Sequence, residues 1–298
     1  MKTRIVRYLF APLMLLAACQ EMEPEEPTGV PGDPVARADS VWTVTIQASK
    51  AGADTKALDL VNDGATLNAY WRSSEKVKVY KGGTLLGTLD VMPDSGDKPA
   101  SATLSGTLTI AGLAVDDELS LIIPNDNWDY TGQAGTLSDI EDYYDYATAT
   151  VSVSAVNGSS ITTTDASFAN GQSVYRFGFK AGGNYFAPKS FTVSAAGGGL
   201  VKSRALGGGT WTSSFGTLTV TPASVPSDFF YYVAIRNEST DADTYSFSII
   251  GSDDALYMAT KAIPSTVLDV PGKFISAKSV NAILSDFSPA GGSTDTAL

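Results

Sequence analysis

Apolar residues alternate with polar ones along many short segments of the chain, and this pattern most constrains the fold. Within 41–49, Trp42, Val44 and Ile46 alternate with threonines. Successive side chains of a strand point to opposite faces, so a period of two predicts a strand with one buried face. No stretch of ten or more residues has the helical period. Strands are predicted at 41–49, 75–80, 84–91, 101–110, 118–123, 147–156, 174–180, 190–195, 217–222, 229–236, 244–250, 256–262 and 273–280.

The residues between these segments indicate where the chain turns and where it divides. Gly82-Gly83 separates two segments of a predicted hairpin, and Asn157-Gly158 predicts a type I′ turn. The glycine triplets at 197–199 and 207–209 are typical of loop tips. About fourteen strands are too many for one β-sandwich. The sequence therefore predicts an all-β protein of two β-sandwich domains, 40–168 and 169–298, divided within the turn-rich segment 165–172.

The amino terminus predicts export and lipid attachment. Three basic residues among the first seven precede an apolar stretch, 8–18, which is too short to span a bilayer and is typical of a signal peptide over 1–18. The stretch ends in Leu16-Ala17-Ala18-Cys19, and Cys19 is the only cysteine of the chain. This sequence resembles a bacterial lipobox, and the resemblance implies acylation of Cys19, with chains such as palmitate that hold the protein on a membrane. An ordinary signal peptide with a chance cysteine is the alternative.

An acidic, proline-containing tether is predicted at 19–39. Residues 20–27 hold four glutamates and two prolines, and such a segment does not bury a core. An acidic run directly after an acylated cysteine also resembles the surface-export signal of Bacteroidota lipoproteins. A plain spacer is the alternative.

The composition excludes several classes of chemistry. The chain has no histidine and one cysteine, which excludes Ser-His-Asp and Cys-His catalysis, His-ligated metals, thiolate zinc sites and an intrachain disulfide. A formal charge of −12 disfavours nucleic acid as a partner. The neighbouring carboxylates at 116–118 and 253–254 lie at turn signals, which disfavours a glycosidase pair. We expect no enzymatic activity, no catalytic residue, no cofactor and no metal.

The densest group of polar and aromatic residues lies at 128–130 and 139–146. Exposed aromatic rings stack on sugars, and carboxylates bind hydroxyl groups or calcium, so a glycan site is one interpretation. The spacing does not match an EF-hand loop. The favoured interpretation is a long surface loop whose tyrosines pack back onto the sandwich.

Several segments resemble the fimbrillin-like proteins, or type V pilins, of Bacteroidota. Asp54-Thr55-Lys56-Ala57, followed by the sequence Tyr-Trp-Arg-Ser-Ser-Glu-Lys-Val-Lys-Val-Tyr at 70–80, is similar to the pattern near the start of those proteins. Residues 173–179 resemble the strand that opens their second half, and 256–260 and 271–274 resemble their closing strands. The resemblance implies two tandem transthyretin-like β-sandwiches in a subunit, anchor or tip of a surface pilus on the outer membrane.

The same resemblance implies how subunits join. It suggests trypsin-like processing at a basic residue of the amino-terminal region, for which Arg37 is the candidate and Lys50 and Lys56 offer other positions. Cleavage would free strand 41–49, and a carboxyl-terminal segment of another fimbrial subunit, such as 273–284, would take its place by β-augmentation. Alternatively, 273–284 is the permanent last strand of its own domain, followed by a polar tail, 285–298.

The expected partners are other fimbrial subunits through strand exchange, the membrane through Cys19, and host or microbial surface ligands. A second class of function stays open at this point. A monomeric surface lipoprotein that binds glycans in a nutrient-uptake system would also be acidic, acylated and rich in strands. Such a protein would need an aromatic platform of fixed geometry, whereas strand exchange needs a removable strand and a donor segment.

Overall fold

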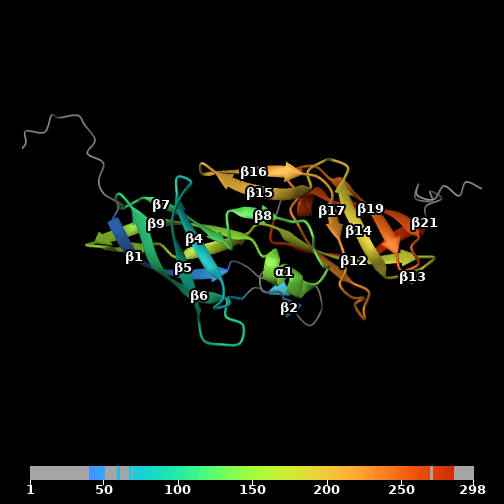
Figure 1. Ribbon diagram of the computed structural model, residues 1–298, viewed down its shortest axis with the longest axis horizontal. Coiled ribbons are helices and arrows are strands. Elements are labelled where there is room, and N and C mark those ends of the chain that lie inside the picture. Colours follow the sequence, from blue (N-terminus) through green and yellow to red (C-terminus); the bar gives the residue numbers. More distant parts are fainter. Residues whose placement is uncertain (1–39, 51–58, 61–66, 69, 269–270, 285–298) are drawn as a thin grey trace, which may run out of the picture. The chain divides into compact units, whose positions relative to one another are not determined.

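The structure is a computed structural model that describes residues 40–50, 59–60, 67–68, 70–268 and 271–284 (Figure 1). These residues are mostly in strands, with one seven-residue α-helix, α1 (Leu137–Tyr143), and one 3-10 turn (Ser265–Val267). The prediction of an all-β protein with two domains is confirmed. Neither helical segment of the described chain is long enough to cross a bilayer.

The first sheet closes on itself through its first strand. On one edge, β1 pairs antiparallel with β6, and on the other edge it pairs parallel with β10 and β11. The interior is largely aliphatic, with the ring of Trp71 packed edge-on against Phe168 at a centroid distance of 5.3 Å. The strands of this sheet are β1 (Ser40–Lys50), β4 (Lys76–Lys81), β5 (Thr84–Pro93), β6 (Ser101–Ile110), β7 (Glu118–Ile123), β9 (Ala147–Asn157), β10 (Ser160–Thr163) and β11 (Ala166–Asn170).

The second sheet encloses an aromatic core. Its last strand, β21, lies between β12 and β20, parallel to the first and antiparallel to the second. Phe177, Phe179 and Phe247 meet at centroid distances between 5.0 and 6.4 Å. The strands of this sheet are β12 (Ser173–Ala181), β13 (Asn184–Tyr185), β14 (Pro188–Ala195), β17 (Leu218–Val220), β18 (Tyr231–Ile235), β19 (Asp243–Gly251), β20 (Leu256–Ile263) and β21 (Phe274–Leu284).

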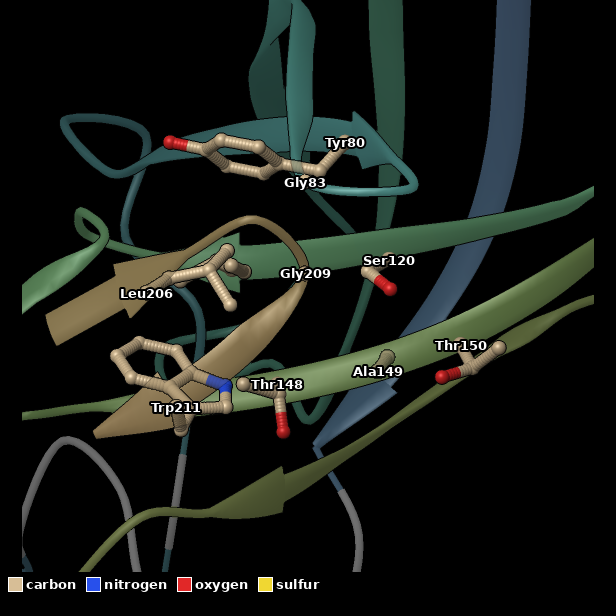
Figure 2. Close-up of a pocket in the computed structure, with 10 residues that line it drawn as sticks. Tyr80, Gly83, Ser120, Thr148, Ala149, Thr150, Leu206, Gly209 and Trp211 are labelled. Atoms are coloured by element: carbon tan, nitrogen blue, oxygen red, sulfur yellow. The ribbon is translucent and has the colours of Figure 1, made fainter. Parts of the chain in front are cut away.

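A third, three-stranded sheet joins the two halves of the sequence. It consists of β8 (Asn127–Asp129), β15 (Val201–Gly207) and β16 (Thr210–Phe215), with β8 paired to β15. Figure 2 shows the β15–β16 hairpin beside residues of β7 and β9. The segment between β7 and β9 also supplies Trp128, Tyr130 and Tyr146 to the aromatic core of the second sheet. A separate pair is formed by β2 (Asp59–Leu60) and β3 (Leu67–Asn68).

Gln133 links the free edges of β17 and β18. Its buried side-chain amide accepts a hydrogen bond from the Ala234 N–H at 2.7 Å and donates to the Ala234 carbonyl at 2.8 Å, as a neighbouring strand would. Its own carbonyl accepts from the Thr221 N–H, next to β17, at 2.9 Å. One glutamine therefore satisfies backbone groups at two strand edges, which buried backbone groups require.

Two local predictions differ from the structure. Segment 165–172, predicted as turn-rich, contains β11, because Ala166 and Phe168 bury one face of a short strand whose other residues are polar or small. The turn after β9 has Gly158 as the first of its two loop residues, since Asn157 pairs with Ser160. Of these two loop residues, only Gly158 has a positive φ, of 60°, which is the pattern of a type II′ turn rather than the predicted type I′ turn.

Candidate functional site

The first strand, β1, is the strand that the sequence analysis predicted to be released when subunits join. Arg37 and Cys19, the predicted processing and acylation residues, lie outside the described residues, as does Lys56. The strand itself begins at Ser40 and agrees with the predicted segment 41–49 within one residue at each end. Val44, Ile46 and Ala48 are buried in the first core, and the residues between them face outward.

Backbone pairing holds β1 along its whole length. Ten registered pairs join it to β6, from Ser40 opposite Ile110 to Ser49 opposite Ser101. On its other edge, the amino-terminal half pairs with β10 and the carboxyl-terminal half with β11. Because both edges are paired, β1 lies inside the sheet and closes it.

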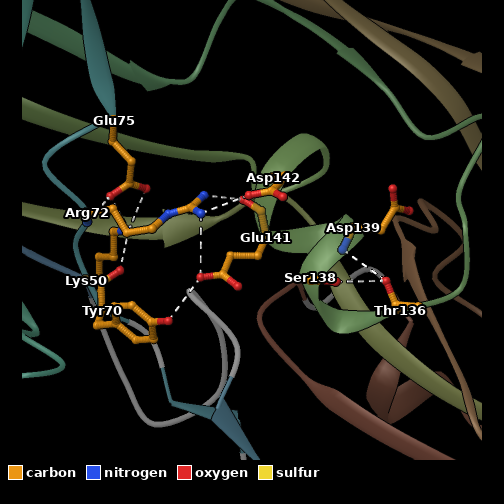
Figure 3. A network of polar contacts seen from close by, with 9 residues as sticks. All are labelled: Lys50, Tyr70, Arg72, Glu75, Thr136, Ser138, Asp139, Glu141 and Asp142. Carbon is orange, nitrogen blue, oxygen red and sulfur yellow. Dashed lines mark hydrogen bonds and ion pairs between the residues drawn. The ribbon is translucent and has the colours of Figure 1, made fainter. Parts of the chain in front are cut away.

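A buried ion pair fixes the carboxyl-terminal end of β1 (Figure 3). The Lys50 side chain is 1% exposed, and its ammonium donates to the Glu75 carboxylate at 2.8 and 3.0 Å and to the Tyr70 carbonyl at 2.8 Å. The same ammonium lies 4.3 Å from the centre of the Trp71 ring. Because Lys50 is buried and paired, it is not an accessible processing position in the folded protein.

The ion pair continues into a second polar contact, with α1. The Glu75 carboxylate also accepts from the Arg72 N–H at 2.8 Å, and the Arg72 guanidinium pairs with Asp142 at 2.9 Å and donates to the Glu141 carbonyl at 2.7 Å. Burial disfavours the Arg72 cation, but its hydrogen bond to Asp142 and the charges of Glu141 and Glu75 outweigh this and raise its pKa. The end of β1 is thereby connected to α1 through charged groups (Figure 3).

The short helix α1 is fixed at its start by its own cap. The Thr136 hydroxyl accepts from the Asp139 N–H at 3.1 Å, and the Asp139 carboxylate accepts from the Ala134 N–H at 2.7 Å. Burial raises the pKa of Asp139, and the hydrogen bond from Ala134 opposes that shift. Capping stabilises such a short helix, which is marginal without tertiary contacts.

The aromatic residues at 128–146 pack inward, as the favoured interpretation expected. Trp128 stacks on Tyr146 at 5.2 Å, and Tyr130 meets Tyr146 edge-on at 5.3 Å. The Tyr146 and Tyr144 hydroxyls donate to backbone carbonyls, and burial raises the pKa of each phenol to about 12. Only Tyr143, 67% exposed, faces solvent among the tyrosines of this segment. The glycan platform considered at these residues does not exist in the fold.

Three of the neighbouring carboxylates, those of Asp117, Asp253 and Asp254, have structural partners. Asp117 accepts from the Ala114 N–H and pairs with Lys81, and the hydrogen bond from Lys81 is the main reason why its pKa is lowered. Asp253 accepts from the Tyr257 hydroxyl and the Ala255 N–H, while Asp254 pairs with Lys189. Within the described part of the chain, no group of three or more acidic or thiol side chains is arranged to hold a metal ion.

The carboxyl-terminal segment 273–284 forms β21 within the sheet of its own chain. Arg176 on β12 donates two hydrogen bonds to the Ser276 hydroxyl, at 3.1 and 2.8 Å, and its guanidinium lies 5.3 Å from the Phe274 ring. This arrangement is the one expected of a permanent last strand. The predicted tail, 285–298, lies outside the described residues.

Sequence reasoning missed the Lys50–Glu75 pair and the β15–β16 hairpin. A signal for the pair was present, because Lys50 continues the buried phase of Val44, Ile46 and Ala48. The sequence indicates the hairpin only weakly, because β16 is Thr-Trp-Thr-Ser-Ser-Phe and has no aliphatic residue to mark a buried face. Its Trp211 lies 4.3 Å from Trp128 of β8, a contact that the spacing along the chain does not reveal.

No family model and no curated protein matches the chain. Solved structures do match it, at low sequence identity. One match, a candidate cell adhesion protein from Bacteroides ovatus, has 11% identity, a TM-score of 0.43 and coverage of 83% of this chain and 97% of the other. A candidate cell adhesion protein from Bacteroides eggerthii has 12% identity, a TM-score of 0.42 and coverage of 84% and 88%. A fimbrial assembly protein from Parabacteroides distasonis has 10% identity, a TM-score of 0.39 and coverage of 84% and 100%.

Proposed function

We propose that the protein reaches the outer membrane as a surface lipoprotein anchored through acylated Cys19, and that after cleavage in its tether it serves as a structural or adhesive subunit of a fimbria. One observation carries this proposal. The strand that directly follows the predicted tether, β1, has both edges paired and one face buried. Release of such a strand leaves a groove that another extended segment fills.

The groove defines what a donor segment must provide. On one side it would present the β6 edge, where β1 now has ten registered partners, and on the other the edges of β10 and β11. Its floor would hold the spaces left by Val44, Ile46 and Ala48. A donor therefore needs small or branched apolar residues at alternate positions, while its backbone supplies the hydrogen bonds.

Electrostatics adds a further requirement on the donor. When β1 leaves, Lys50 leaves with it, and Glu75 loses its cationic partner in a nearly buried position. An unpaired buried carboxylate is costly, by about 3–5 kcal/mol. A donor that brings a lysine or arginine to Glu75 removes this cost. Segment 273–284 holds Lys273 and Lys278, whereas the tail 285–298 holds no basic residue and would leave Glu75 unpaired.

The release step is assigned to cleavage near Arg37, in the tether before β1. The burial of Lys50 supports a site upstream of the strand, because a protease reaches exposed, extended chain most readily. The donor is assigned to a carboxyl-terminal segment of a neighbouring subunit. In its own chain β21 is already placed between β12 and β20, so the incoming segment is either the tail 285–298 or a β21 that has left its sheet.

Electron microscopy of the native cell surface with an antibody to this chain tests the proposal. We expect filaments with the parent, soluble or unprocessed protein with Cys19→Ala, and anchored but unassembled protein with Arg37→Ala or with a chain ending at Ser285. Lys76→Ala, which removes an exposed basic residue of β4, is the matched control and should assemble normally. Normal filaments from both Arg37→Ala and the truncated chain would contradict strand exchange.

A further inference from the structure

A groove of about 190 Å³ lies between the outer face of the first sheet and the β15–β16 hairpin (Figure 2). On the sheet side it is lined by Tyr80, Ser120 and Thr150, which form one row across β4, β7 and β9, because Tyr80 is opposite Ser120 and Ser120 is opposite Thr150. Thr148 continues the lining along β9, and Trp211 lines it from the hairpin.

The groove is preformed because its two sides are tied together. The tips of two hairpins touch at Gly83 and Gly209, where a Cβ on Gly83 would lie 2.1 Å from the Gly209 nitrogen. Nearby, the Leu206 N–H donates to the Asp126 carbonyl at 2.8 Å. Trp211 is held by Trp128 at a ring distance of 4.3 Å. Because the walls are already ordered, a ligand does not have to order them when it binds, which reduces the entropic cost of binding.

The lining combines apolar surface with hydroxyl groups and has no charged side chain. Tyr80, Trp211, Leu206 and Ile122 supply the apolar part, and three hydroxyl side chains supply the polar part. Figure 2 shows the Trp211 ring and the Thr148 and Thr150 hydroxyls around the same opening. The Arg204 guanidinium lies 5.1 Å from the centre of the Trp211 ring, but it pairs with Glu238 and is not itself part of the lining. The lining therefore provides no charged group to pair with an anion or a cation.

We propose that this groove is a binding site for one neutral sugar ring. At about 190 Å³ the groove is smaller than the pockets of about 300–1,000 Å³ that take drug-sized ligands, which limits its ligand to about one ring. A pyranose has an apolar C–H face for the Trp211 ring and hydroxyl groups that pair with Ser120, Thr148 and Thr150. The proposal does not depend on strand exchange, since none of these residues belongs to β1 or β21.

Saturation-transfer NMR on the full-length mature chain in detergent tests the site. The probes are the methyl pyranosides of glucose, galactose, mannose, fucose and N-acetylglucosamine, at up to about 20 mM because one-ring ligands bind weakly. We expect transfer to at least one probe. We also expect an affinity loss of about tenfold or more for Trp211→Ala and of about fivefold for Thr150→Val, which removes one exposed hydroxyl group at nearly constant volume.

Two controls make the outcome decisive. Phe215→Ala changes an exposed aromatic residue of the same strand outside the groove and should bind like the parent. Thr150→Val keeps the test valid should Trp211→Ala disturb the packing of Trp128. Sialic acid, which is anionic, is added as a sixth probe. The proposal is overturned by the absence of transfer to every neutral probe, by binding that neither groove variant weakens, or by a response to sialic acid alone.

Discussion

The two terminal strands of the described chain, β1 and β21, are held in their sheets by different means. In the aliphatic first half, β1 contributes three apolar side chains to the core and ends in the buried Lys50–Glu75 pair. In the aromatic second half, β21 is fixed near its start by Arg176 and contributes Ala277, Val280 and Ala282 to a core that its neighbours dominate.

The two halves therefore differ in which interactions stabilise their terminal strands. The second core consists largely of phenylalanine and tyrosine side chains, each of which buries more area than an aliphatic residue. The attachment of β1 depends more on backbone hydrogen bonds and one charge pair, which a donor strand can reproduce. The first half is therefore suited to exchange a strand, and the second half to remain folded while it does so.

The largest effect is expected in the aromatic core. Phe177→Ala removes a fully buried ring that contacts Phe179, Phe191 and Phe247, and should lower the free energy of unfolding by about 3–5 kcal/mol. Guanidinium unfolding followed by tyrosine and tryptophan fluorescence measures it. Phe215→Ala, 50% exposed on β16, should cost at most about 0.5 kcal/mol. Equal costs for the two variants would show that the buried aromatic rings are not what stabilises the second half.

The next effect concerns the end of β1. Lys50→Met leaves Glu75 buried without its cation and should destabilise the protein by about 3–5 kcal/mol. Adding Glu75→Gln removes the unpaired charge and keeps an acceptor for the Arg72 N–H, so the double variant should recover more than half of the loss. A double variant no more stable than Lys50→Met would show that the charge pair is not what fixes β1.

A somewhat smaller effect is expected at the link between β17 and β18. Gln133→Leu leaves the N–H and carbonyl of Ala234 without their partners and should cost about 3 kcal/mol. Hydrogen exchange should then show faster exchange of the Ala234 amide proton. Gln47→Leu, at an exposed glutamine of β1, is the control and should cost little. Unchanged protection at Ala234 would mean that β18 does not need this link.

The contact between hairpin tips predicts a difference between two adjacent glycines. Gly83→Ala places a Cβ against the Gly209 backbone at a φ of +83°, and should cost about 2–3 kcal/mol. Gly82→Ala has a φ of +55° but meets no neighbouring atom, and should cost about 1 kcal/mol. Thermal unfolding of both variants measures the difference. Equal midpoints would show that the groove walls are not tied at this point.

The smallest effect is a pH dependence at Asp117. Its hydrogen bonds from Lys81 and Ala114 lower its pKa in the folded state, so the carboxylate stabilises the fold above its ordinary pKa. That contribution is lost as the pH falls through the lowered folded pKa. Asp117 is partly exposed, so the effect should stay below about 1 kcal/mol. Unfolding of Asp117→Asn between about pH 5 and 2 should show a correspondingly weaker acid dependence.

The alternating segments show how much of this fold is predictable from sequence. Strands β6 and β7 have the predicted bounds, because each buries one face and ends at turn-forming residues. Strands β8, β15 and β16 were missed because they depend on pairing between distant segments. Gln133 could not be recognised from the spacing of apolar residues, because its role depends on hydrogen bonds to two strands that are distant in the sequence. The groove around Trp211 could not be predicted for the same reason.

Under the proposed anchoring through Cys19, and before any cleavage near Arg37, the position of β1 has a mechanical consequence. A pull on Ser40 along the strand axis loads its ten registered pairs with β6 together, in shear, instead of opening them one after another. The strand also ends in Lys50, whose charge must leave a buried carboxylate before the strand can slide. Tension applied through the anchor would therefore be borne first by the pairing of β1 with β6 and by the Lys50–Glu75 ion pair, and not by the aromatic core.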